Sequence, residues 1–123
     1  MVRISNESRS KALIAAEAAS AKKAGEILIL DVEPLIGITD YFVICSGNTE
    51  RQVKTIADEV MRKMLENGLK PYRREGEREN RWVLLDYLDI VVHIFHVEER
   101  EFYGIERLWR DATTVPFEDR QLA

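Results

Sequence analysis

Four short runs of consecutive apolar residues constrain the fold of this chain more than any other feature. They cover residues 27–30, 42–45, 83–85 and 90–92. Each run is too short for a typical helix and is bounded by polar or turn-forming residues, so each predicts a β-strand. Successive side chains of a strand point to opposite faces, and an unbroken apolar run therefore predicts a sheet that is buried on both faces.

Helix and strand patterns follow one another along the chain in the order α-β-β-α-β-β-β-α. The predicted helices cover residues 7–24, 49–67 and 98–110, and the predicted strands cover residues 26–32, 40–47, 71–75, 82–87 and 90–97. This order predicts one α/β domain over residues 1–123, with a mixed sheet of about five strands and three helices. Its core is expected over residues 7–112, and residues 113–123 are expected to form a loose tail. Three helices are few for two sheet faces, so a partner subunit could complete the cover.

The middle helix has the clearest local pattern. Thr49 and Gln52 have the spacing of a capping box, in which each side chain bonds a free backbone N–H of the first turn. Asn67 and Gly68 are typical of a helix end. The apolar positions recur every three or four residues, as expected for one buried stripe. The stripe consists of Val53, Ile56, Ala57, Val60, Met61, Met64 and Leu65.

Charge and cysteine content narrow the class of protein. The 123 residues include 18 Lys and Arg against 22 Asp and Glu, for a formal net charge of −4. This balance argues against a protein that binds nucleic acid mainly by neutralising phosphates. The single cysteine, Cys45, cannot form an internal disulfide, and no apolar stretch approaches the length of a membrane span. We therefore expect a cytoplasmic protein with no resident cofactor.

Three groups of polar residues could in principle form chemical sites. Asp31, Asp40, Asp86 and Asp89 all lie at predicted strand ends, where four carboxylates could hold magnesium for phosphoryl transfer. Aspartates also commonly end strands and cap turns, and no two of these four lie as a D-x-D pair on one strand. The loop 46–49 joins a strand to a helix but lacks a phosphate-binding signature. His93 and His96 point to opposite faces of a strand, which disfavours a shared metal.

Large amphipathic side chains suggest a protein interface instead. Trp82 is expected to share a strand face with Leu84 and Asp86, so these three would form one patch wherever no helix covers them. The alternative is that Trp82 and Trp109 only fill the core. Further aromatic residues near charges are Tyr72, Tyr87 and Tyr103.

A set of short motifs, in order from residue 8 to residue 112, resembles the ribosomal silencing factor family, also called RsfS, Iojap or YbeB. The most specific segments are Thr39-Asp40-Tyr41-Phe42, Trp82-Val83-Leu84-Leu85-Asp86 and Val91-Val92-His93-Ile94-Phe95. Weaker matches are Asp31, Ser46-Gly47, Arg51-Gln52-Val53, Ile56-Ala57-Asp58, Glu75-Gly76, Asp89, Arg100, Phe102-Tyr103 and Leu108-Trp109. Leu88 stands where the family usually has glycine, so the turn before Asp89 is the main departure.

The resemblance implies a factor that is not an enzyme. Such a factor binds the large ribosomal subunit through its ribosomal protein fourteen, blocks joining of the small subunit and lowers translation during starvation or stationary phase. The resemblance also implies a nucleotidyltransferase-like fold without the catalytic site, and a homodimer. An acidic protein is expected to dock on basic ribosomal protein and to make little direct contact with RNA.

These expectations select a partner-binding surface. Its predicted residues are Trp82, Leu84, Asp86, Asp89, His93 and Tyr103. The competing hypothesis is a metal-dependent phosphotransferase that uses Asp31, Asp40, Asp86 and Asp89, and a third is a module that only dimerises.

Overall fold

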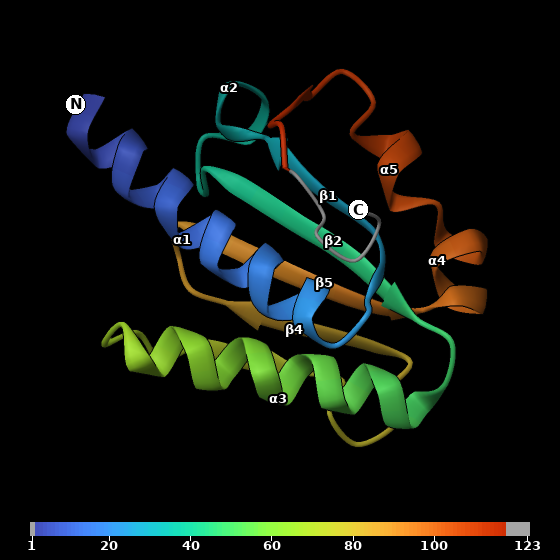
Figure 1. Ribbon diagram of the computed structural model, residues 1–123. Helices are drawn as coiled ribbons and strands as arrows, with labels where there is room; N and C mark the ends of the chain where they lie inside the picture. The colour runs from blue at the N-terminus through green and yellow to red at the C-terminus, as the bar shows by residue number, and fades with distance from the viewer. Residues whose placement is uncertain (1, 118–123) are drawn as a thin grey trace.

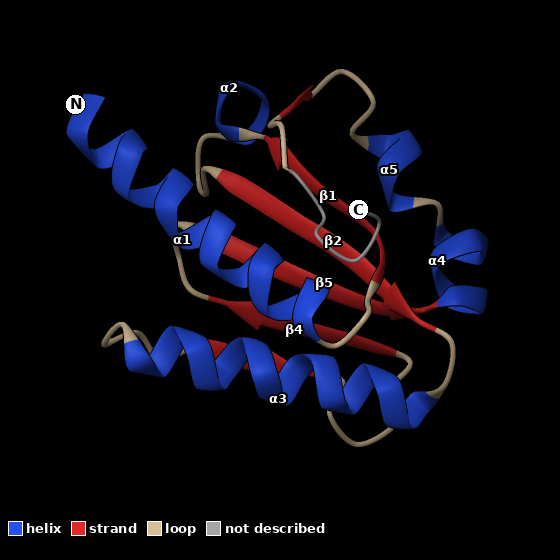
Figure 2. Ribbon diagram, viewed as in Figure 1, coloured by secondary structure: helices blue, strands red, loops and turns tan. Residues whose placement is uncertain are grey.

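A six-stranded mixed sheet forms the centre of the computed structural model, which describes residues 2–117 (Figures 1 and 2). In chain order the strands are β1 (Gly25–Asp31), β2 (Tyr41–Gly47), β3 (Arg73–Glu75), β4 (Trp82–Asp86), β5 (Ile90–His96) and β6 (Thr113–Thr114). The spatial order is β3-β4-β5-β2-β1-β6. Only β2 and β5 pair in parallel, while the other neighbours are antiparallel. The α/β class and the mixed sheet are confirmed, and β6 is a sixth strand that was not predicted.

Two long helices cover one face of this sheet, which we call the first face. These two helices are α1 (Val2–Ala21) and α3 (Glu50–Glu66). The shorter helical segments are α2 (Glu33–Ile36), α4 (Val97–Tyr103) and α5 (Ile105–Leu108). Helices α1 and α3 lie side by side in front of the sheet (Figure 1). Ala12, Ala15, Ala16 and Ala19 of α1 are all fully buried, because small side chains let the helix lie close to its neighbours. This face holds the larger core cluster.

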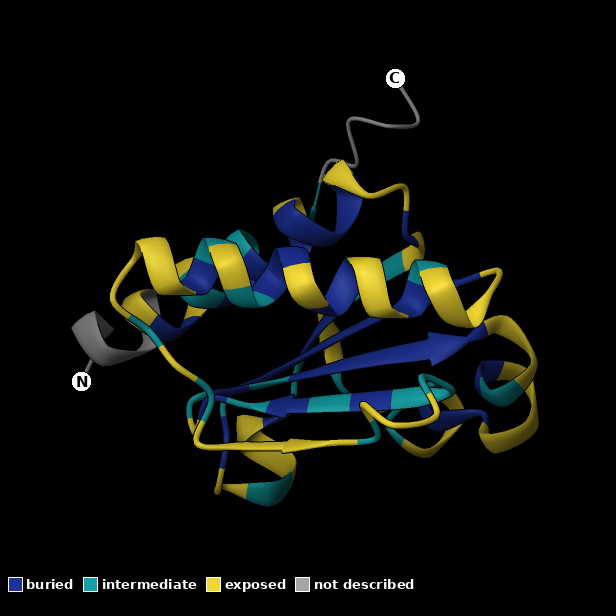
Figure 3. Cartoon of the chain, turned by 90° about the horizontal axis from the view of Figure 1, so that it is seen from below, coloured by how far each residue is buried: buried dark blue, intermediate teal, exposed yellow. Residues whose placement is uncertain are grey.

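The opposite, second face is covered less completely. Leu30, Phe42, Ile44 and Phe95 point to it and pack against Ile105 of α5. Figure 3 shows the long helices on one side of the sheet and only short helical segments on the other. The same view shows β4 alternately buried and partly exposed, beside the exposed edge strand β3. The helices therefore leave the second face partly uncovered at its β4 end, as the small number of predicted helices suggested.

Helix α3 begins as its sequence predicts. The Thr49 hydroxyl accepts a hydrogen bond from the backbone N–H of Gln52 at 3.0 Å. The Gln52 side chain in turn accepts from the backbone N–H of Asn48 at 2.7 Å. The residues of the predicted stripe are buried or partly buried, except Leu65, which is 54% exposed. Leu65 lies at the edge of the stripe, one residue past Met64, and the helix packs through the centre of that stripe.

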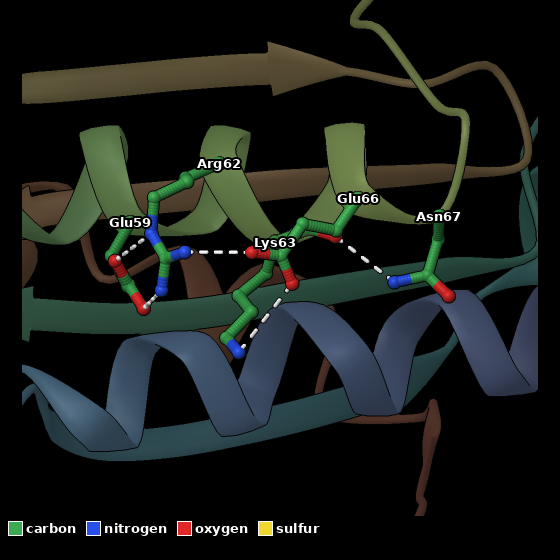
Figure 4. A network of polar contacts seen from close by, with 5 residues as sticks. All are labelled: Glu59, Arg62, Lys63, Glu66 and Asn67. Carbon is green, nitrogen blue, oxygen red and sulfur yellow. Dashed lines mark hydrogen bonds and ion pairs between the residues drawn. The ribbon is translucent and has the colours of Figure 1, made fainter.

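The last turns of α3 carry a network of ion pairs, shown in Figure 4. Arg62 donates through Nε and Nη2 to the two carboxylate oxygens of Glu59, at 2.9 and 2.8 Å, and through Nη1 to Glu66. These hydrogen bonds lower the pKa of Glu59. Lys63 pairs with Glu66 at 3.6 Å, and the Asn67 amide donates to the Lys63 carbonyl. Pairs three and four residues apart add a few tenths of a kcal/mol each, so this network stabilises the helix locally.

Helix boundaries depart from the prediction at both ends of the chain. Helix α1 covers Val2–Ala21 rather than 7–24, and it ends where Lys23 takes a left-handed backbone conformation with φ 62°. The helix predicted over 98–110 is wrong as one element. It is divided into α4 and α5 by Gly104, whose φ of 56° closes the first helix with a left-handed cap. The count of three helices therefore rises to five helical segments within the described residues.

The predicted loose tail is wrong for its first residues. Thr113 and Thr114 pair with β1, and the buried Val115 donates its backbone N–H to Ile29 at 2.8 Å. Two residues of strand are too few to give an alternating pattern, so the sequence carries little sign of β6. Residues 118–123 of the predicted tail lie outside the described residues.

Two expectations about the protein's class can be compared with the structure. Within the described part of the chain, no helix is long and apolar enough to cross a membrane. Cys45 is fully buried on β2, and burial raises the pKa of its thiol to about 12. The thiol is therefore protonated at neutral pH, as expected for a cysteine of the core.

Candidate docking surface

Trp82 opens β4 on the second face of the sheet. Its neighbour Val83 is fully buried on the first face, whereas Trp82 is half-buried and packs against the smaller core cluster. The turn before it depends on Gly76, which has a φ of +86°. A side chain at position 76 would collide with the carbonyl oxygen of Trp82, so only glycine allows this close approach. The glycine thus fixes the start of the strand that carries the tryptophan.

Aromatic rings surround Trp82. Its indole stacks on Phe95 of β5 with ring centres 4.7 Å apart, and it lies 5.0 Å from the ring of Tyr103 on α4. The indole N–H donates to Nδ1 of His93 at 3.2 Å. Phe102, which is 78% exposed, meets the Tyr103 ring edge to face. The rings form a continuous aromatic surface from the sheet to α4.

A groove of about 380 Å³ opens on the same face. His93, Leu84 and Asp86 line it; Leu84 and His93 are direct cross-strand partners. The further lining residues are Ile36, Ile38, Thr39, Phe42, Arg73, Leu88 and Val91. Arg73 lies 3.7 Å from the Asp86 carboxylate, so the two opposite charges offset each other in the lining. We call the aromatic residues Trp82, Phe102 and Tyr103 together with this groove the docking surface.

The predicted surface residues are therefore not all in one place. Trp82, Leu84, Asp86, His93 and Tyr103 lie together on the second face. The Asp89 carboxylate instead accepts from Lys11 of α1 at 2.6 Å, which turns it toward the helices of the first face. Sequence reasoning missed Ile38, Thr39 and Leu88 as groove residues. Ile38 and Thr39 immediately precede the second predicted strand, and the parallel pairing of β2 with β5 brings this end of the segment to the groove that His93 also lines.

Leu88 stands where the resemblance noted in the sequence implies glycine. It adopts a left-handed backbone conformation with φ 74°, in which glycine has no steric penalty. The Asp86 carboxylate accepts from the backbone N–H of Leu88 at 2.8 Å and thereby supports this turn. The leucine side chain is 55% exposed and lines the groove. Leucine at this position therefore adds an apolar side chain to the docking surface.

The protonation state of His93 follows from its contacts. Burial lowers the pKa of the imidazole to about 4, so the ring is neutral at pH 7. The indole of Trp82 can only donate, so Nδ1 must accept and the ring proton must sit on Nε2. Nε2 is buried and has no hydrogen-bond partner.

We expect His93 to make folding stability depend on pH. Its pKa is about 4 in the folded chain and near 6.5 when unfolded, so between these values only the unfolded chain binds the proton. The titration of His93 alone should therefore lower the free energy of unfolding by about 3 kcal/mol as pH drops from 7 to 4. Urea unfolding of the wild type and His93→Gln at several pH values measures the difference. Parallel pH curves for the two proteins would contradict this assignment.

The four aspartates of the phosphotransferase hypothesis do not form one site. Asp31 accepts from the backbone N–H of Glu33, and Asp40 accepts from the Ser8 hydroxyl at 2.6 Å. Asp86 supports the turn at Leu88, and Asp89 pairs with Lys11. Each carboxylate thus already has a hydrogen-bond or ion-pair partner within the fold, and no three of the four come together among the described residues. This arrangement gives the phosphotransferase hypothesis no geometric support.

Two other polar groups have structural explanations. At the loop 46–49, Thr49 and Gln52 already bond the backbone N–H groups that an anion would need. His96, Glu98 and Glu99 are the only group of metal-ligand type that comes together among the described residues. Arg81 pairs with both glutamates at 2.8 and 2.7 Å, and His96 accepts from the backbone N–H of Glu98 to cap α4.

The chain is similar in sequence and structure to known proteins. The family model described as ribosomal silencing factor during starvation matches residues 5–123. A ribosomal silencing factor RsfS from Bacillus subtilis is 48% identical over 99 residues, which are 80% of this chain and 84% of that protein. A crystal structure of a Chromobacterium violaceum protein superposes with a TM-score of 0.81 at 32% identity, covering 89% of this chain and 90% of that one.

A more distant relative is named for the large ribosomal subunit. The mouse protein "Mitochondrial assembly of ribosomal large subunit protein 1" is 32% identical over 102 residues, which are 80% of this chain and 43% of that protein.

Proposed function

The chain belongs to the ribosomal silencing factor family, and we propose that it binds the large ribosomal subunit and blocks joining of the small subunit. The proposed contact is ribosomal protein fourteen, and the proposed outcome is lower translation in the cytoplasm during starvation or stationary phase. On this proposal the protein is a regulator that works by occupying a surface rather than by catalysis.

The docking surface is the observation that supports this proposal most strongly. It combines half-buried aromatic anchors, Trp82 and Tyr103, with an open groove that is lined mainly by apolar side chains. Aromatic anchors beside a pocket are typical of the few residues that carry most of the binding energy at an interface. The net charge of −4 opposes contact with ribosomal RNA and favours a basic ribosomal protein. The proposal also includes a homodimer, which sedimentation equilibrium of the free protein would test.

A subunit-joining assay tests the proposed function. Large subunits are incubated with the protein before small subunits are added, and the joined ribosomes are measured on sucrose gradients. We expect the fraction of joined ribosomes to fall as the protein concentration rises, because a bound factor excludes the small subunit. The protein denatured before use is the matched control. An unchanged joined fraction at saturating protein would contradict the proposal.

A further inference from the structure

Two residues that line the groove each have a buried polar atom without a hydrogen-bond partner. Within the described residues, the buried side-chain atoms without one are Thr39 Oγ1, Tyr87 OH, His93 Nε2 and Glu99 Oε1. Glu99 Oε1 is still paired ionically with Arg81, and Tyr87 belongs to the core of the first face. The other two atoms, from Thr39 and His93, both belong to residues that line the groove.

An unpaired buried polar atom destabilises a folded protein, and nearly all such atoms in native structures find a partner. Two such atoms on residues that line one groove indicate that their partners come from another molecule. The His93 Nε2–H can only donate, since Nδ1 already accepts from Trp82. The Thr39 hydroxyl can donate or accept. A molecule that pairs with both must carry a hydrogen-bond acceptor beside an apolar group.

The charges around these atoms select the chemistry of that acceptor. The imidazole is neutral, and the positive charge of Arg73 is offset by the Asp86 carboxylate. A phosphate or carboxylate would therefore enter an apolar groove without a free positive charge to meet it. The remaining lining side chains are aliphatic or aromatic. An uncharged main-chain amide next to an apolar side chain fits all of these features.

We propose that the groove binds a short extended segment of the protein partner: an apolar side chain enters the groove, a main-chain carbonyl accepts from His93 Nε2, and a second main-chain group of the segment pairs with Thr39 Oγ1. This inference rests on the proposed function and names how the same surface recognises its partner. Because both atoms are sealed in the free protein, binding must displace side chains at the groove. Ile38, which is 85% exposed, and Leu88 are the exposed apolar side chains that line it.

Two matched pairs of variants test the inference by titration with isolated large subunits. Thr39→Val and Tyr87→Phe each remove an unpaired buried hydroxyl, so both should keep or raise Tm. Only Thr39→Val should weaken binding, by about tenfold, which corresponds to 1.4 kcal/mol. His93→Asn keeps an acceptor for Trp82 but loses the Nε2 donor, whereas His93→Gln places an amide N–H near Nε2. We expect His93→Gln to bind more tightly than His93→Asn.

The outcomes separate the inference from the proposed function. If the wild-type protein binds large subunits and Thr39→Val binds as tightly as Tyr87→Phe, the inference is overturned and the proposed function stands. Absence of wild-type binding would overturn the function, and the groove would then be judged with N-acetyl-leucine amide. A saturable shift of the His93 Nε2 signal in NMR spectra, weakened by Thr39→Val, supports the inference. No shift at the solubility limit of that probe contradicts it.

Discussion

Replacing Trp82 with alanine is expected to weaken binding to large ribosomal subunits by about thirtyfold, or about 2 kcal/mol. The indole joins the sheet, through Phe95 and His93, to Tyr103 on α4. Its removal takes away the central ring of the docking surface and leaves the neighbouring rings without their packing partner. Titration of fluorescently labelled protein with large subunits measures the change.

The control for Trp82→Ala is Leu65→Ala. Leu65 is an exposed apolar side chain on α3, the helix that covers the opposite face of the sheet. Its replacement should leave subunit binding unchanged. Circular dichroism must show that both variants are folded. A folded Trp82→Ala protein that binds as tightly as the wild type would contradict the assignment of the docking surface.

Replacing Arg100 with methionine is expected to lower the free energy of unfolding by about 3 kcal/mol. Arg100 is only 5% exposed and pairs through Nε with Glu106 at 2.5 Å. Its Nη1 donates to the Gly25 carbonyl and the Ser46 hydroxyl, both at 3.2 Å. One guanidinium thus ties α4 and α5 to the ends of β1 and β2, and its loss leaves a partly buried carboxylate unpaired.

The same change should also weaken partner binding. Arg100 lies one turn before Tyr103 on α4, so loosening this helix displaces the ring that packs on Trp82. Arg51→Met is the control, because Arg51 is exposed on α3 and should tolerate replacement within about 0.5 kcal/mol. Urea unfolding of both variants gives the comparison. Equal stability of the two would show that the buried arginine does not hold α4 in place.

The parts of the fold that follow from local pattern were predicted well. The apolar runs became β1, β2, β4 and β5, and the Thr49 cap and the stripe of α3 took their expected positions. The failures were at points that depend on tertiary contacts. Gly104 divides the last helical pattern because its left-handed conformation turns Ile105 into the second-face core. Strand β6 exists only because β1 offers it a free edge.

The candidate surface was predictable only in part for the same reason. Alternation along one strand placed Trp82, Leu84 and Asp86 together, and the structure agrees. The contribution of Thr39 and Ile38 required the parallel pairing of β2 with β5, which joins segments about fifty residues apart and leaves no local signal. Asp89 was predicted to meet a basic partner protein, but Lys11 on a distant helix pairs with its carboxylate.

Co-sedimentation of the full chain with isolated ribosomal subunits tests the central claim most directly. The protein is mixed at low salt with large subunits, with small subunits or with neither, and each mixture is centrifuged through a sucrose cushion. The proposed function predicts that the protein pellets with large subunits and stays in the supernatant in the other two mixtures. Binding to neither subunit, or equal binding to both, would contradict it.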